Sequence, residues 1–132
     1  MKKVLITGAG SYIGTSFEHY LTEHYPGMYD VCTVDMRNDG WRNMAFRGYD
    51  VVFHVAGIAH IKETDENAEL YYKVNRDLTV ECAKKALSEQ VPHFVFLSSM
   101  SVYGMNSGRI IKETEPSPTT NYGKSKLEAE ND

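Results

Sequence analysis

The sequence contains little that points to secretion, to a membrane or to a disulfide framework. Its 132 residues include only two cysteines, Cys32 and Cys82, which do not stand at the spacing of metal ligands. The apolar run after the first three residues is too short for a signal peptide, so we expect free thiols rather than a disulfide. No stretch approaches the roughly 20 apolar residues of a membrane span. These absences predict a cytoplasmic, soluble protein without membrane contacts.

An excess of positive charge is also absent. The formal net charge is −4 and no cluster of Lys and Arg interrupts the sequence, which argues against nucleic acid as a partner. The histidines His54, His60 and His93 have no neighbours at metal-ligand spacing, so no metal is expected. His54 alternates within an apolar run and is expected to be a hydrogen-bonded core residue. The length suits one domain with a sizeable core.

Short apolar runs alternate with longer amphipathic stretches along the chain. Strands are expected over residues 4–6, 30–35, 49–56 and 93–97, and helices over 12–24, 67–87 and from Asn121 onward. This alternation predicts a parallel sheet with helices on both faces. Only thirteen residues separate Asp35 from Tyr49, which leaves room for one helical turn near residues 41–46. We therefore expect a sheet that lacks one strand of the usual set.

A glycine-rich segment, Thr7-Gly8-Ala9-Gly10-Ser11-Tyr12-Ile13-Gly14, joins the first expected strand to the first expected helix. Glycines at such a point allow a tight turn and let the backbone approach a pyrophosphate at the helix N-terminus. Gly14 would let the helix pack closely on the strand. The strand-turn-helix context favours dinucleotide binding over an ordinary turn that needs glycine for its geometry alone.

Asp35 ends the second expected strand, about twenty residues beyond the glycines, where a carboxylate can bind the adenosine ribose hydroxyls and disfavour a 2′-phosphate. Arg37 stands two residues further on and suits that phosphate instead. A solvated charge at a strand end is the third interpretation of Asp35. The sequence favours NAD as the cofactor, with NADP as the alternative.

Hydroxyl groups and a Tyr–Lys pair follow the fourth expected strand. Ser98 and Ser99 stand at its carboxyl end, where open α/β sheets bind ligands; a serine-rich strand exit with local hydrogen bonds is the alternative. Tyr122 and Lys126 are four residues apart and lie on one face of a helix. An ammonium group placed there favours the phenolate of a tyrosine, which suits general acid/base chemistry.

Five features follow one another along the chain: T-G-A-G-S-Y-I-G at 7–14, V-F-H-V-A-G at 52–57, Asn75 in the long helix, S-S-M-S-V-Y-G at 98–104 and Y-G-K-S-K at 122–126. Together they resemble the extended short-chain dehydrogenase/reductase family, in particular the NAD-dependent epimerases and dehydratases that act on nucleotide sugars. The resemblance covers nearly the whole chain. It implies a Rossmann-like, doubly wound α/β fold, truncated to about four to five strands with helices on both faces.

The resemblance also implies roles for single residues. The pyrophosphate would be lined by Gly8, Gly10, Ile13 and Gly14, while Ala56 and Gly57 would pass under the cofactor and Asn75 would support the site. Ser99, four residues before the tyrosine of V-Y-G, would be the catalytic hydroxyl rather than Ser98. Tyr122 would be the acid/base, and Lys126 would bind the nicotinamide ribose and favour the Tyr122 phenolate.

The sequence departs from the family pattern at two points. The usual glycines are spaced G-x-x-G-x-x-G, so Ser11 stands at the middle glycine and Gly10 is displaced by one, which predicts an altered loop geometry. Family members usually run well past twice this length. We therefore expect residues 1–132 to be the NAD(P)-binding Rossmann-like domain of such an enzyme, with the C-terminal substrate lobe absent from this chain.

The expected chemistry is hydride and proton transfer on a nucleotide sugar, carried by Ser99, Tyr122 and Lys126. The first alternative is an NADPH-dependent reductase of the same superfamily, and the second is a non-catalytic dinucleotide-binding or assembly module. In the family the long helix and the tyrosine helix pair across a dimer. The resemblance therefore implies a homodimer formed through residues 67–87 and the helix after Asn121.

Overall fold

The computed structural model describes residues 1–59 and 61–132 and divides into two compact units. Unit 1 comprises Met1–Ala56 and Glu81–Leu97, and unit 2 comprises Gly57–Val80 and Ser98–Asp132. His60, one of the three histidines considered as metal ligands, lies outside the described residues.

Unit 1 contains a sheet of four parallel strands in the order β2-β1-β3-β4. The strands are β1 (Lys2–Thr7), β2 (Tyr29–Val34), β3 (Val51–His54) and β4 (His93–Phe96). The chain moves from β1 to β2 on one side and then to β3 on the other, so the strand order reverses at β1. Ligands of such sheets bind outside the carboxyl ends of the strands at this reversal. All four expected strands are confirmed, with shifted ends.

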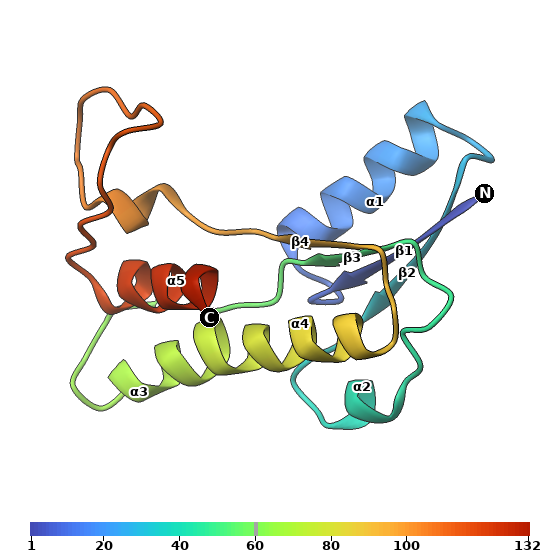
Figure 1. The fold of residues 1–132 in the computed structure, drawn as a ribbon, viewed down its shortest axis with the longest axis horizontal. Helices are drawn as coiled ribbons and strands as arrows, with labels where there is room; N and C mark the ends of the chain where they lie inside the picture. Colours follow the sequence, from blue (N-terminus) through green and yellow to red (C-terminus); the bar gives the residue numbers. More distant parts are fainter. Residues whose placement is uncertain (60) are drawn as a thin grey trace. The chain divides into compact units, whose positions relative to one another are not determined.

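Helices cover both faces of this sheet. Figure 1 shows α1 (Tyr12–His24) on one face, and α2 (Gly40–Asn43) with the C-terminal part of α4 (Leu78–Ser88) on the other. Phe17 of α1 meets Phe53 of β3 edge to face, with ring centroids 5.0 Å apart. Cys82 of α4 and Trp41 of α2 are fully buried. The expected doubly wound α/β fold is therefore confirmed, and the segment between β2 and β3 holds only the short helix α2.

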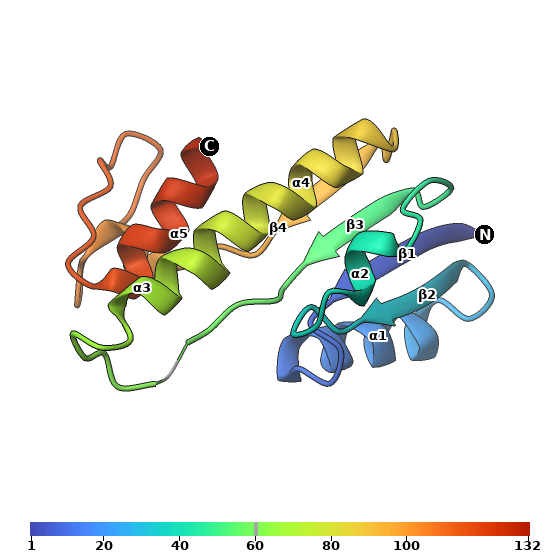
Figure 2. The same ribbon diagram turned by 90° about the horizontal axis from the view of Figure 1, so that it is seen from below.

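Unit 2 contains the first part of one long helical run, up to Val80, and the last helix of the chain. The run begins with α3 (Ala68–Tyr71), widens into a π-helical segment (Tyr72–Asp77) and continues as α4, where the sequence predicted a single helix over 67–87. Helix α5 (Asn121–Asn131) lies beside α3 and the π-helical segment in both Figure 1 and Figure 2. Widened turns of this kind occur frequently at functional sites.

Polar contacts attach α5 to the long helical run. The Tyr72 hydroxyl donates to Asn121 Oδ1 (2.9 Å), Asn75 Nδ2 donates to Ser125 Oγ (3.3 Å), and Arg76 Nη1 donates to Glu128 Oε2 (2.9 Å). The three α5 residues are spaced four and three apart, so they lie on one face of the helix. Because each contact needs a particular donor and acceptor, these three hydrogen bonds fix the position of α5 along the long helical run more narrowly than apolar packing would.

Candidate functional site

The glycine-rich loop leaves the carboxyl end of β1 in unit 1. Gly8 and Gly10 have φ angles of +80° and +78°, which side-chain-bearing residues rarely adopt. A Cβ at Gly8 would lie 3.3 Å from Cα of Ala56, so the loop runs close against the end of β3. A Cβ at Gly14 would lie 3.3 Å from Ile6 Cγ2, which confirms the close packing of α1 on β1 expected from the sequence.

Ser11 explains how the loop departs from the usual glycine spacing. Its φ of −71° and ψ of 154° are ordinary for any residue, and the left-handed conformations of the loop fall on Gly8 and Gly10. The Ser11 hydroxyl accepts a hydrogen bond from the Gly14 amide (3.1 Å) and so caps α1. Among the described residues no partner is found for the amides of Gly10, Tyr12 and Ile13. Such free donors at a helix N-terminus suit an anion.

A buried hydroxyl that the sequence analysis missed lies directly beneath this loop. Thr7 Oγ1 accepts hydrogen bonds from the amides of Val55 and Ala56 (3.1 Å each) and lies 2.9 Å from Nδ1 of His54. Because both acceptor positions of the hydroxyl are used, its hydrogen donates to Nδ1, so His54 carries its ring proton on Nε2. His54 is a hydrogen-bonded core residue, as expected, and Thr7 fixes the backbone that leads to Ala56.

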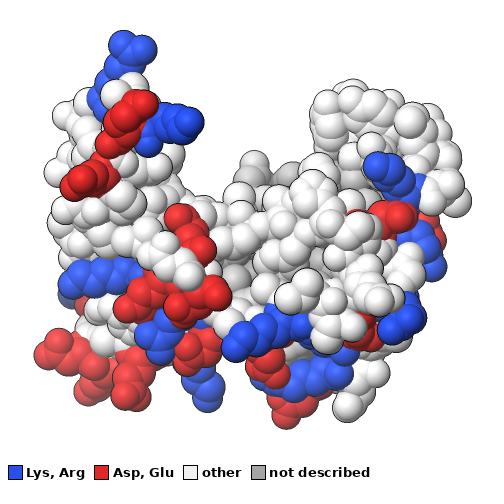
Figure 3. Space-filling view, viewed as in Figure 1, with Lys and Arg blue, Asp and Glu red and all other residues white. Residues whose placement is uncertain are grey.

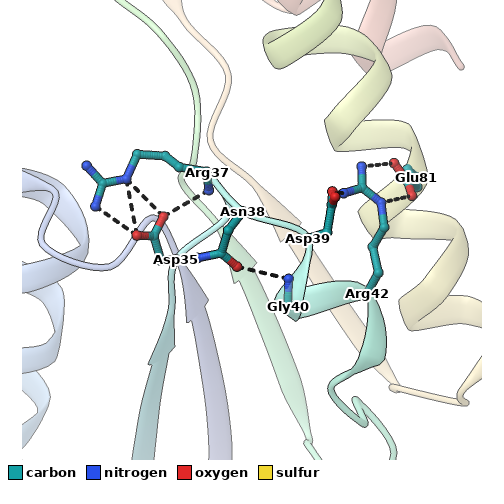
Figure 4. Close-up of polar contacts among 7 residues, drawn as sticks. All are labelled: Asp35, Arg37, Asn38, Asp39, Gly40, Arg42 and Glu81. Carbon is teal, nitrogen blue, oxygen red and sulfur yellow. Dashed lines mark hydrogen bonds and ion pairs between the residues drawn. The ribbon is translucent and has the colours of Figure 1, made fainter.

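The structure brings together the two residues that the sequence treated as alternatives for cofactor choice. Arg37 donates to the Asp35 carboxylate from its backbone amide (2.9 Å), from Nε (3.0 Å) and from Nη2 (2.8 Å), as Figure 4 shows. These hydrogen bonds hold the pKa of Asp35 at about 2. Asp35 therefore carries a charge that its neighbour compensates, while the Arg37 side chain remains 86% exposed.

The segment between β2 and β3, which carries Asp35 and Arg37, makes a second ion pair at Arg42. Arg42 of α2 donates from Nε and Nη2 to the Glu81 carboxylate of α4, at 2.6 and 2.8 Å (Figure 4). The Arg42 guanidinium also lies over the Trp41 ring, 4.6 Å from its centre. The Arg42–Glu81 contact joins α2 to α4 within unit 1, and so holds the C-terminal side of the loop that carries Asp35.

Tyr122 and Lys126 lie on α5 in unit 2, and Lys126 is almost fully buried, with 4% of its surface exposed. Burial lowers the pKa of Lys126 to about 8. A Cβ at Gly57 would lie 2.8 Å from Asn75 Oδ1 and 3.2 Å from Lys126 Nζ, so these three residues meet. The structure thus brings Gly57, Asn75 and Lys126 into one cluster.

Asn75 holds this cluster by its side-chain amide. Its Oδ1 accepts from the Ile58 amide (2.9 Å), and its Nδ2 donates to the Ile58 carbonyl (3.0 Å) as well as to Ser125. Asn75 is completely buried, and a buried polar group that lost these partners would destabilise the fold. It supports both the segment after Gly57 and the helix that carries Tyr122.

Ser99 caps the short 3₁₀ turn Met100–Tyr103, because its hydroxyl accepts from the Ser101 amide (3.1 Å). The hydroxyl keeps its own hydrogen, which it can donate to a ligand. The Ser98 hydroxyl already donates its hydrogen to the Glu130 carboxylate of α5, so it is not available to a ligand in the same way. The turn packs against α5 at Gly123, next to Tyr122.

The rest of the described surface offers no metal centre. Among residues 1–59 and 61–132 no group of three or more His, Cys, Asp or Glu side chains could hold a metal ion. The thiols of Cys32 and Cys82 are free. Acidic and basic side chains lie interspersed over the face drawn in Figure 3. None of the described helices is long and apolar enough to cross a membrane.

A parallel sheet that reverses at β1, with a left-handed glycine loop at the carboxyl end of that strand, defines a Rossmann-like α/β protein. The model of the NAD dependent epimerase/dehydratase family matches residues 4–132. The chain belongs to this family.

Named relatives agree with this assignment. The UDP-glucose 4-epimerase of Vibrio cholerae is 29% identical over 153 residues, which cover 98% of this chain and 45% of that protein. The UDP-glucose 4-epimerase of Halalkalibacterium halodurans is 30% identical over 146 residues, or 96% of this chain and 44% of that protein. The chain thus spans less than half the length of these two relatives.

Solved structures show the same fold. MoeE5 in complex with UDP-glucose and NAD superposes with a TM-score of 0.82 at 25% identity, over 98% of this chain and 47% of that one. The UDP-Glc/GlcNAc 4-epimerase from Campylobacter jejuni superposes with a TM-score of 0.84 at 21% identity, over 99% of this chain and 47% of that one. At that identity the second likeness concerns the fold alone.

Proposed function

We propose that this chain is the NAD(P)-binding part of a nucleotide-sugar epimerase or dehydratase-like oxidoreductase, with Ser99, Tyr122 and Lys126 as its catalytic residues. The observation that carries the proposal is the burial of Lys126 one helical turn from Tyr122. Lysine is rarely buried in proteins, and ionisable groups whose pKa is perturbed by burial cluster at functional sites.

The residues of unit 1 fit a dinucleotide. Gly8 and Gly10 keep side chains away from the loop, and the unpartnered amides of Gly10, Tyr12 and Ile13 suit a pyrophosphate. In unit 1 the residues proposed to hold the cofactor are Gly8, Gly10, Ile13, Gly14, Asp35 and Ala56, and in unit 2 they are Gly57, Asn75, Tyr122 and Lys126. NAD is bound by MoeE5, and we assign NAD to this chain as well, with NADP as the alternative.

Each proposed catalytic residue has a distinct task. A bound nicotinamide supplies the acceptor and donor of hydride. The Tyr122 phenolate removes the proton of the sugar hydroxyl whose carbon loses hydride, and later returns it. The Lys126 ammonium, one helical turn from Tyr122, binds the nicotinamide ribose. The Ser99 hydroxyl donates a hydrogen bond to the same sugar oxygen, with its orientation set by the Ser101 amide.

Two other functions remain as alternatives. The exposed guanidinium of Arg37 beside Asp35 favours an NADPH-dependent reductase, because it suits a 2′-phosphate. A non-catalytic dinucleotide-binding or assembly module is the second alternative, and NAD binding without turnover would favour it. UDP-glucose is bound by MoeE5, and a nucleotide sugar is the substrate class we propose.

The proposed assembly is a homodimer. The run Ala68–Asp77 and helix α5 lie side by side in unit 2, and Leu70 on that run is 43% exposed. A second copy that packs on these helices would cover this apolar surface. Sedimentation equilibrium checks the proposal: a single monomeric species at high concentration would overturn it.

The free thiols of Cys32 and Cys82 suit the cytoplasm, the compartment we propose.

Calorimetry with NAD, followed by turnover assays on UDP-sugars, tests the function. Wild-type protein is expected to bind NAD and to reduce it transiently when a UDP-sugar is added. Tyr122→Phe removes only the hydroxyl, so it is expected to lose turnover and to weaken NAD binding far less, whereas Tyr20→Phe, a change at a half-exposed tyrosine of α1, keeps both. Binding without turnover in the wild type would support the module, and absence of NAD binding would refute the cofactor assignment.

A further inference from the structure

A carboxylate far from α5 in the sequence occupies its N-terminus. Glu63 Oε1 accepts a hydrogen bond from the Asn121 amide (2.8 Å), and Glu63 Oε2 accepts one from the Tyr122 amide (3.4 Å). Both partners belong to the first turn of the helix that carries Tyr122 and Lys126. Glu63 is separated from them by 58 and 59 positions, so this contact belongs to the tertiary structure.

The other early amides of α5 already have local partners. Thr120 Oγ1 accepts from the Gly123 amide (3.0 Å), and the Thr120 carbonyl accepts from the Lys124 amide (2.9 Å). Helices leave their first amides without intrahelical partners. Glu63 therefore supplies the two acceptors that Thr120 cannot, and its negative charge lies at the positive end of the helix dipole.

The segment that carries Glu63 is itself anchored. The Tyr71 hydroxyl donates to the Ile61 carbonyl (2.8 Å), and Asn67 Nδ2 donates to the Lys62 carbonyl (2.8 Å). Thr64 and Asn67 exchange two further hydrogen bonds through their side chains. Glu63 is thus held from both sides, so it can impose a position on α5 rather than follow it.

The same anchor reaches the Tyr122 ring. Tyr71, whose hydroxyl holds the Ile61 carbonyl, packs edge to face on Tyr122, with ring centroids 6.5 Å apart and planes at 64°. Glu63 fixes the backbone of Tyr122 while Tyr71 fixes its ring, and both are linked through residues 61–63. The negative charge of Glu63 also helps to raise the pKa of Tyr71, after burial, the larger cause.

We propose that Glu63 is a positioning residue: its carboxylate sets the place and angle at which α5 presents Tyr122. The role in turnover rests on the proposed function, whereas the hold on the helix does not. Glu63→Ala removes both acceptors. Glu63→Gln keeps one acceptor oxygen and removes the charge. Glu66, an exposed carboxylate of the same segment, provides the matched control in Glu66→Ala.

Hydrogen exchange measured by NMR on the full chain tests the hold directly. In Glu63→Ala the Asn121 and Tyr122 amides are expected to exchange about five- to tenfold faster, the change that loss of a helix cap produces. Glu63→Gln should lie between this variant and the wild type, and Glu66→Ala should match the wild type. Unchanged exchange at Asn121 and Tyr122 in Glu63→Ala would overturn the proposal.

Kinetics and the Tyr122 ring test the functional part. Glu63→Ala is expected to lower kcat about tenfold with KM and the Kd for NAD unchanged, and Glu63→Gln is expected to restore most of it. An equal loss in Glu66→Ala, or a change in KM alone, would overturn the proposal. If the wild type shows no turnover, the proposed function fails. The positioning role is then tested by the ¹³Cζ resonance of Tyr122, which is assigned by its absence in Tyr122→Phe. It should move in Glu63→Ala, and an unmoved resonance would overturn the positioning role.

Discussion

Gly123 of α5 lies so close to the Ser101 carbonyl oxygen that a Cβ at position 123 would stand 2.5 Å from it. A Cβ atom added there would force the two backbone segments apart. The contact therefore joins the turn that carries Ser99 to the residue next to Tyr122. Glycine at this position is required by the approach of two backbone segments, since it lies within a helix and needs no unusual φ.

Gly123→Ala is expected to push the turn and α5 apart. Alanine would favour the helix itself by roughly 0.5–1 kcal/mol, so a net loss of stability would identify the clash as the larger effect. We expect a loss of about 1–3 kcal/mol in urea unfolding, as for overpacked sites, and a larger fall in turnover than in NAD affinity. Lys124→Ala, at the next and exposed position, should leave stability and turnover unchanged. Wild-type stability in Gly123→Ala would contradict the required close approach.

Gly10 and Gly27 form a matched pair that isolates the cofactor loop. Their φ angles are +78° and +76°, and a Cβ at either would meet nothing within 4 Å. Gly10→Ala and Gly27→Ala should therefore lose the same stability, about 1 kcal/mol. Only Gly10→Ala should also weaken NAD binding, by about tenfold, because only Gly10 lies in the proposed pyrophosphate loop. Calorimetry and urea unfolding measure the two effects, and equal NAD affinities would argue against the loop assignment.

The spacing of apolar residues, together with the glycines and prolines that bound each segment, was sufficient to predict the fold of unit 1. The short apolar runs that end at Gly8 and Gly57 are buried parallel strands, and helix α1 has the predicted bounds, Tyr12–His24. The thirteen residues between Asp35 and Tyr49 leave no room for another strand. These features depend on neighbours in sequence, which is why the sequence reveals them.

The polar contacts within the units were not predictable in the same way. Thr7 with His54 and Glu63 with Asn121 are pairs 47 and 58 positions apart, and no local pattern marks either partner. The π-helical widening over Tyr72–Asp77 leaves no signal in the apolar spacing that predicted one regular helix. Asn75 was found only through a motif, since an asparagine on the buried face of a helix contradicts the apolar period.

Lys126 predicts a pH dependence of stability. In the unfolded chain its ammonium loses the proton near pH 10.5, whereas burial lowers the pKa in the fold to about 8. Between these values the unfolded chain binds more protons, so the free energy of unfolding rises with pH from about pH 8 to 10.5. The gain is at most about 3 kcal/mol.

Lys126→Met provides the comparison that removes other titrating groups. Urea unfolding at several pH values should show the rise in the wild type and a smaller rise in the variant, so that their difference follows the ionisation of Lys126. The difference between the two proteins should be nearly constant below pH 8, where Lys126 is charged in both the folded and the unfolded state. Parallel curves for the two proteins across this window would show that Lys126 titrates normally.

The ion pair between Asp35 and Arg37 is expected to set the preference of the chain between NADH and NADPH. A bare carboxylate repels the 2′-phosphate of NADPH, but here Arg37 compensates the charge and remains exposed. Arg37→Gln should therefore weaken NADPH binding about tenfold or more, since a charged hydrogen bond contributes about 1.5–3 kcal/mol. NADH binding should stay nearly constant in this variant, because Asp35 still accepts from the ribose hydroxyls.

Asp35→Asn should act in the opposite direction. It removes the carboxylate and frees the Arg37 guanidinium for the phosphate, so NADPH should bind more tightly and NADH less tightly than to the wild type. Arg42→Gln is the control, because Arg42 is also an ion-paired arginine of this segment but pairs with Glu81 (Figure 4). Fluorescence titrations with both nucleotides give the ratio of the two dissociation constants. A ratio that is the same in Arg37→Gln, Arg42→Gln and the wild type would exclude Arg37 from cofactor choice. A ratio that is also unchanged in Asp35→Asn would leave Asp35 as a solvated strand-end charge.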